Sequence, residues 1–89
     1  MKNVNELRVE DLRPIDKNGV LGRYLKALSQ YEYQKENIIP FYDKMEKWEE
    51  KEYKSVVEST LTELNEMKDI LINHLQKTLD FYNVSFNNL

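Results

Sequence analysis

The residues best suited to chemistry in this chain are the single histidine, His74, and the carboxylates Glu63, Glu66 and Asp69. These carboxylates recur every three residues. On a helix they share a face that holds a divalent cation only weakly unless a second helix adds ligands. The positions three and four residues from His74 hold no carboxylate and no second imidazole, whereas a zinc or facial-triad site needs at least three ligands. We expect a polar histidine and a solvated acidic face, with weak metal or cofactor binding as the last alternative.

The sequence contains no motif for other kinds of catalysis. The chain has no cysteine, which excludes disulfides, thiolate metal sites and cysteine nucleophiles. It shows no nucleophile–base pair and no dinucleotide fingerprint. The segment Gly19-Val20-Leu21-Gly22 lacks the preceding strand and the basic residue of a phosphate loop, which favours a turn and a helix start. We expect no enzyme, no cofactor, no metal and no small-molecule substrate.

Aromatic side chains are the stronger candidates, because Tyr and Trp are favoured at protein interfaces. Tyr31 and Tyr33 lie about 200° apart on a helix, so they cannot both face one core. Trp48, the only tryptophan, stands in the charged run KMEKWEEKEYK. For each aromatic residue, packing at the rim of the protein's own core is the alternative. The candidate interaction residues are Tyr31, Tyr33, Trp48, Tyr53, Phe81, Tyr82 and Phe86.

The charge distribution argues against nucleic acid and membranes as partners. The net charge is −3; residues 1–35 carry seven basic and five acidic side chains, and residues 36–89 carry six and eleven. Binding to phosphates or anionic lipids depends on clustered cations. The chain also lacks a Sec signal and any apolar run near the roughly 20 residues that would span a bilayer. We expect a soluble, cytoplasmic protein, with export by other machinery left open.

Composition predicts one small helical domain. Two glycines, two prolines and 33% charged residues favour helices over a turn-rich β fold. We divide the chain into an N-terminal leader (1–17), a helical domain (18–82) and a short C-terminal tail (83–89). The leader pattern fits either a short helix or an extended segment.

Apolar spacing predicts a first helix over 18–38, in which Leu21, Leu25 and Leu28 recur at steps of three and four. Pro40 then interrupts, since proline inside a helix costs about 3 kcal/mol. From Phe41 to Tyr82 there is neither glycine nor proline.

Within that stretch the apolar face changes sides. Phe41, Met45 and Trp48 form one stripe, whereas the later stripe begins at Val57, about half a turn away around a straight helix. Two architectures follow. Either the chain bends between 49 and 55, with Ser55-Val56-Val57-Glu58 as a capping box for a new helix, or one helix of about 43 residues presents two faces to two partners. In both architectures, Trp48 packs against the protein itself, as part of the stripe with Phe41 and Met45.

The last helix, about 55–82, carries a coiled-coil-like seam at Leu61, Leu64, Leu71 and Leu75. The sequence therefore predicts an all-α fold, a small antiparallel helical bundle or helical hairpin of two to three helices with a long C-terminal helix. The function we expect is non-catalytic protein–protein interaction, by a small adaptor, inhibitor or regulator that docks a helix face on a partner protein. The alternative is a structural subunit that self-assembles as a homodimer or larger homo-oligomer.

Overall fold

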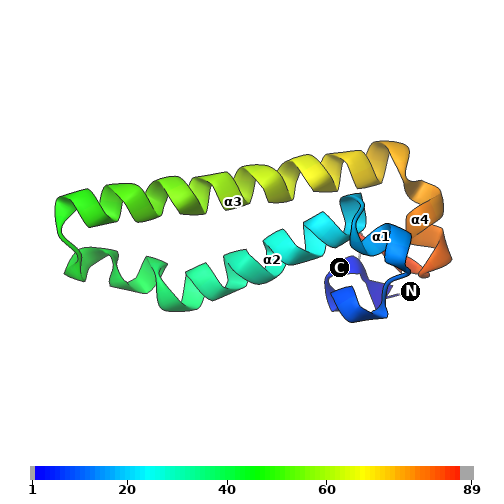
Figure 1. Cartoon of the computed structure of the whole chain (residues 1–89), viewed down its shortest axis with the longest axis horizontal. Coiled ribbons are helices and arrows are strands. Elements are labelled where there is room, and N and C mark those ends of the chain that lie inside the picture. Colours follow the sequence, from blue (N-terminus) through cyan, green and yellow to red (C-terminus); the bar gives the residue numbers. More distant parts are fainter. Residues whose placement is uncertain (1, 87–89) are drawn as a thin grey trace.

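A helical hairpin organises the chain, and its turn follows from one proline. The computed structural model describes residues 2–86. Helix α2 (Val20–Asn37) ends before Pro40, a 3-10 helix η3 (Ile39–Lys44) makes the turn, and α3 (Lys47–His74) returns beside α2 (Figure 1). Pro40 has no N–H to continue the helical ladder. The predicted all-α class with a long C-terminal helix is confirmed, and the first predicted helix is right to within two residues.

The long helix α3 is uninterrupted over 28 residues. The predicted bend between 49 and 55 is therefore wrong. Its proposed capping box at Ser55 does not start a helix. The box forms instead at Glu46, whose side chain accepts from the Glu49 backbone N–H while the Glu49 side chain accepts from the Glu46 N–H. This reciprocal pairing satisfies two of the free N–H groups at a helix start, so α3 begins at Lys47.

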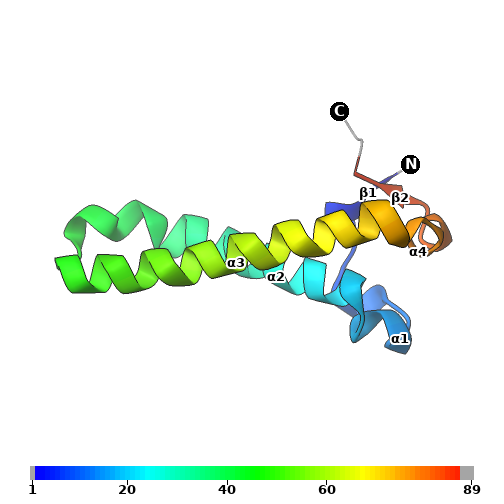
Figure 2. The ribbon, with the colours of Figure 1, turned by 90° about the horizontal axis from the view of Figure 1, so that it is seen from above.

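The alternative expectation, one helix from Phe41 to Tyr82, is also wrong. Its first residues belong to η3, and the extended backbone of Met45 separates them from α3. At its other end the helix stops at Leu75, with φ −125° and ψ 37°, and a short helix α4 (Gln76–Phe81) follows in a new direction (Figure 2). The predicted last helix over 55–82 is thus divided between α3 and α4.

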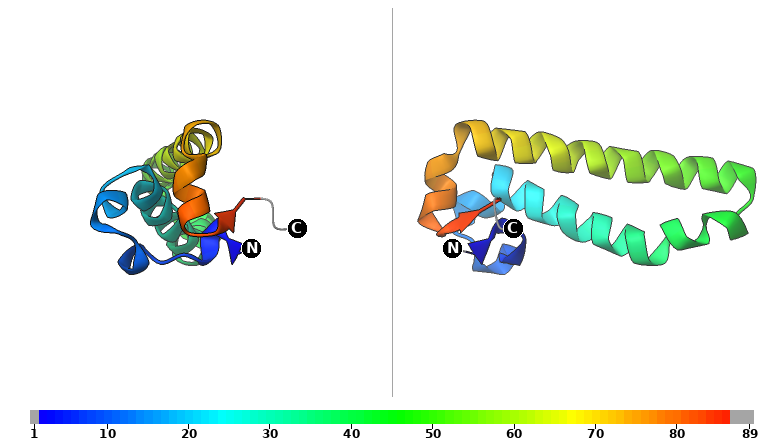
Figure 3. Two further views of the ribbon diagram at one scale, coloured as in Figure 1. Left: turned by 90° about the vertical axis from the view of Figure 1, so that its right-hand side faces the viewer. Right: turned by 180° about the vertical axis from the view of Figure 1, so that it is seen from behind.

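Short elements from both ends of the sequence close the hairpin opposite its turn (Figure 3). Two-residue strands β1 (Lys2–Asn3) and β2 (Val84–Ser85) pair in parallel, with Lys2 opposite Val84. Met1 of the predicted leader and residues 87–89 of the predicted tail lie outside the described residues. The remaining elements of the leader are η1 (Val4–Glu6), η2 (Val9–Asp11) and α1 (Pro14–Lys17).

The hydrophobic core lies at this closed end. Every buried member of its main cluster comes before Lys26 or after Glu66 in the sequence. The leader and the tail supply Val4, Leu12 and Val84 beside the five members from α2 and α3, and Leu79 of α4 is also buried. The cluster consists of Val4, Leu12, Leu21, Tyr24, Leu25, Met67, Leu71, Leu79 and Val84.

Gly22 allows α1 and α2 to approach closely at this end. A Cβ atom at Gly22 would lie 2.1 Å from the carbonyl oxygen of Lys17, and real Cβ atoms do not come that close to a backbone oxygen. Glycine is therefore required here for space, since it alone has no Cβ.

Candidate interaction surface

The half of the hairpin near the turn has little core of its own. In the stretch 28–66 the buried side chains are those of Val57 and Gln34, and one of these two is polar. Several large apolar side chains of this stretch are exposed, namely Tyr33, Phe41, Trp48, Tyr53 and Val56. Contiguous exposed apolar patches mark interaction sites, whereas apolar side chains exposed singly are normal.

Trp48 is exposed, which corrects the expectation that it packs within a buried stripe. Its exposed fraction is 62%, and Phe41 of the same predicted stripe is also exposed. The indole Nε1 donates a hydrogen bond of 3.1 Å to Oε2 of Glu46, the residue that precedes the first residue of α3. The physical reason is the position of the turn. Because α3 starts at Lys47, Trp48 lies in its first turn, at the turn end of the hairpin and away from the core cluster at the closed end.

Two further apolar side chains share the exposed side of α3 with Trp48. Tyr53 is 40% exposed and Val56 49% exposed. Together with Glu49 and Glu52 they line one shallow depression of about 280 Å³. The steps between these residues are those of one helix face. We call this set (Trp48, Glu49, Glu52, Tyr53 and Val56) the acidic–aromatic face.

The lysines of the same helix segment lie on a different side. Lys47, Lys51 and Lys54 line a groove between α3 and η3 that also contains Tyr42. There the Lys54 ammonium pairs with Glu50 at 3.1 Å and lies 5.4 Å from the centre of the Tyr42 ring. Carboxylates but no lysines therefore line the depression with the exposed aromatic residues, whereas the groove toward the turn is lined by these lysines together with Glu50 and Glu58.

The predicted aromatic residues of α2 do not belong to this face. Tyr31 is half-buried, and the Lys35 ammonium lies 5.2 Å from its ring centre. Tyr33 is exposed, but it lines a separate depression with Val9 and Lys26. The structure thus places Trp48 and Tyr53 together and leaves Tyr33 apart from them.

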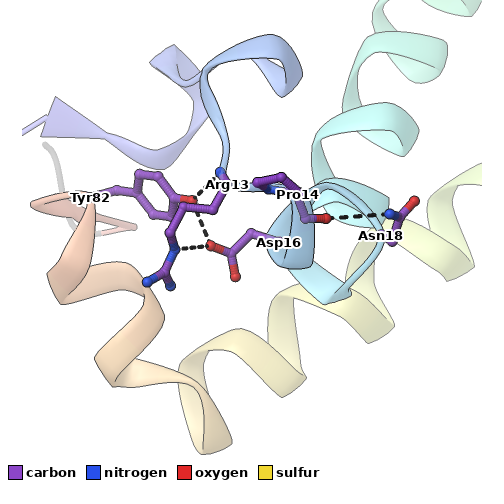
Figure 4. A network of polar contacts seen from close by, with 5 residues as sticks. All are labelled: Arg13, Pro14, Asp16, Asn18 and Tyr82. Carbon is purple, nitrogen blue, oxygen red and sulfur yellow. Dashed lines mark hydrogen bonds and ion pairs between the residues drawn. The ribbon is translucent and has the colours of Figure 1, made fainter.

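The predicted residue Tyr82 lies in a polar network at the closed end (Figure 4), and the neighbouring Phe81 is 58% exposed. The Tyr82 hydroxyl accepts from the Arg13 backbone N–H at 2.8 Å and donates to Asp16 Oδ2 at 2.5 Å. Arg13 Nε donates to the same Asp16 oxygen at 2.8 Å, and its guanidinium lies 3.7 Å from the centre of the Phe81 ring. One tyrosine therefore ties the leader to the end of α4.

This network shifts two pKa values. Partial burial is the largest influence on Asp16 and raises the pKa of its carboxyl group, but hydrogen bonds from Tyr82 and Arg13 outweigh it and lower the pKa below the usual value. The hydrogen bond to Asp16 in turn raises the pKa of Arg13. The ionised pair is thus the stable form at neutral pH.

Phe86 is half-buried and packs edge-on against Tyr24, with ring centres 5.3 Å apart. Tyr24 is buried, and its hydroxyl donates to Asn5 of the leader at 2.8 Å. Burial, followed by the nearby charge of Glu32, raises the pKa of Tyr24. Phe86 therefore contacts the protein's own core.

The residues considered for metal chemistry are placed as follows. His74 is exposed at the end of α3, and Glu63 pairs with Arg23 of α2 at 2.8 Å. Among residues 2–86, no three His, Cys, Asp or Glu side chains gather in a way that would hold a metal ion.

Sequence reasoning missed Val56, Glu49 and Glu52 as parts of the surface. Their spacing from Trp48 in the sequence could have identified them. Val56 and Glu52 lie eight and four residues after Trp48, which places all three on one side of a straight helix.

Within the described part of the chain, no helix combines the length and the apolar character needed to cross a bilayer. No model of a known protein family matches the chain, and no characterised protein or solved structure shows significant similarity to it.

Proposed function

We propose that this chain is a non-catalytic protein–protein interaction module, an adaptor or inhibitor that docks a partner protein on the acidic–aromatic face. The observation that carries the proposal is the exposure of Trp48 beside Tyr53 and Val56 on a continuous helix. Trp and Tyr contribute large contact areas and are enriched among the residues that dominate binding energy.

The exposed area of Trp48 is large enough to contribute substantially to the free energy of binding. With 62% of Trp48 exposed, covering its side chain removes roughly 150 Å² from water, which contributes up to about 4 kcal/mol by area alone. The face is also preorganised, because helix α3 holds these side chains before any partner arrives. Little backbone order then has to be created on binding, which favours affinity.

Affinity capture from the native cell, followed by mass spectrometry, tests the proposal with a matched pair of variants. Trp48→Ala combined with Tyr53→Ala removes the aromatic part of the face. Tyr33→Ala removes an exposed aromatic residue elsewhere. We expect a partner that the wild type and Tyr33→Ala retain and the double variant loses, while circular dichroism shows all three folded. If the captured proteins are the same with all three, the proposal is wrong.

A further inference from the structure

We infer that the partner segment on the acidic–aromatic face is a cationic amphipathic helix, with Lys or Arg placed among its apolar side chains. The inference rests on the proposed function and names the chemistry of the partner. Trp48 and Val56 are separated by eight residues, or about 12 Å along the helix axis. Two turns of a partner helix match that length and present anchors at helical spacing.

The carboxylates on the face select the charge of the partner. Glu49 and Glu52 line the same depression as the aromatic residues. Glu52 forms no hydrogen bond or ion pair with any residue of 2–86, and the lysines of this segment lie toward η3. Glu49 already accepts the Glu46 backbone N–H, so an apolar partner without cations would cover the Glu52 carboxylate without pairing it, which is costly.

The aromatic rings favour the same partner charge. A cation over an indole face is attracted by the ring quadrupole, and tryptophan is the best of the aromatic residues in this role. The protein already uses the contact internally, with Arg13 3.7 Å from the Phe81 ring centre and Lys54 5.4 Å from that of Tyr42. The Trp48 ring remains exposed to a cation from outside.

A second copy of the chain fits the face less well. In a symmetric pair the same patch meets itself. Glu49 and Glu52 of one copy would then share the buried surface with the same carboxylates of the other, and like charges in contact are destabilising. A partner that supplies cations avoids this repulsion.

The experiment uses the fluorescence of Trp48, which is the only tryptophan and therefore reports on this face alone. The probe is an amphipathic helical peptide of Leu and Lys, about 18 residues long, and its counterpart has Glu at every Lys position. We expect the Lys peptide to shift Trp48 emission to shorter wavelength, saturably and at an ionic strength of about 0.15 M. The Glu peptide should leave the emission unchanged.

Charge-reversal variants separate recognition from net charge. Glu52→Lys changes the face and leaves the Glu46–Glu49 capping box intact, and Glu66→Lys makes the same change in net charge elsewhere on α3, where Glu66 lines another depression. We expect Glu52→Lys to weaken binding of the Lys peptide at least about tenfold. Glu66→Lys should retain most of the wild-type affinity for the Lys peptide.

Three results would overturn the inference. Equal weakening by Glu52→Lys and Glu66→Lys would show that net charge alone attracts the Lys peptide. A stable dimer in solution with Trp48 emission already shifted would identify a second copy as the occupant. An unchanged emission with the Lys peptide, while cellular capture still depends on Trp48 and Tyr53, would remove the inference and leave the proposed function standing. Loss of that dependence would remove the proposed function itself.

Discussion

Gln34 offers the sharpest test of the packing between α2 and α3. Its side chain has an exposed fraction of 0%, and its Nε2 donates to Thr60 Oγ1 at 3.0 Å. Its Oε1 has no hydrogen-bond partner among the described residues. The Thr60 hydroxyl also donates to the carbonyl oxygen of Val56 at 3.1 Å. Replacing Gln34 by Met therefore removes the unpaired oxygen and leaves Thr60 with a partner.

The expected magnitude follows from two opposing effects. A buried acceptor without a partner costs about 1–3 kcal/mol, whereas the lost hydrogen bond to Thr60 contributes about 1 kcal/mol. Met is unbranched, flexible and similar in length to Gln, so the site can hold it with little strain. We expect Gln34→Met to raise the free energy of unfolding by about 1 kcal/mol, which raises Tm by about 4–8 °C for a domain of this size.

Urea unfolding followed by far-ultraviolet circular dichroism measures this change, provided that the slope against urea concentration is the same in both proteins. Thr60→Val is the companion variant. It leaves Gln34 Nε2 unpaired and should lower the free energy of unfolding by about 1–3 kcal/mol. In the Gln34→Met background the same substitution should cost much less. A Gln34→Met protein that is less stable than the wild type by more than about 1 kcal/mol would refute the reasoning, because Oε1 would then be well paired.

Three further predictions concern the two ends of the hairpin. Trp48→Ala should lower the free energy of unfolding by at most about 2 kcal/mol, against about 3–5 kcal/mol for Leu71→Ala in the core, as measured in urea; similar losses would show that Trp48 is buried. Gly22→Ala should cost at least about 1–3 kcal/mol, because its Cβ would overlap the Lys17 carbonyl oxygen, and an unchanged Tm would contradict the close approach. The pKa of Asp16 is lower in the folded state than its ordinary value of 3.8, so its carboxylate stabilises the fold above that pH and the stabilisation is lost as pH falls through the folded pKa. Between pH 7 and pH 3 the Tm of Asp16→Asn should therefore fall less than that of the wild type, and an equal fall would contradict this role.

The features that could be predicted from sequence depend on local interactions. Steps of three and four between leucines indicate α2 and the seam of α3, because helical periodicity is a property of neighbouring residues. Pro40 marks the turn, since a missing N–H and a steric clash act within one helical turn. The same locality explains the error at Ser55, where a capping-box pattern occurs inside a helix that tertiary packing keeps continuous.

The end of α3 had no comparable local signal. Leu75 is neither glycine nor proline, yet its backbone leaves the helical conformation. The chain turns there so that Leu79 and Val84 join the core with Val4 and Leu12 of the leader. Contacts between residues so far apart in sequence outweigh the small helical preference of any one position.

For the candidate surface, too, sequence and tertiary structure determine different features. The sequence by itself determined a helical, charged chain without cysteine, with aromatic residues as the candidates for binding. Only the tertiary structure decided which of them remain available. It places Tyr82 and Phe86 in contacts that close the hairpin, and it leaves Trp48 and Tyr53 exposed beside carboxylates. The physical reason is that a small chain buries one core, and where that core forms depends on which distant segments meet.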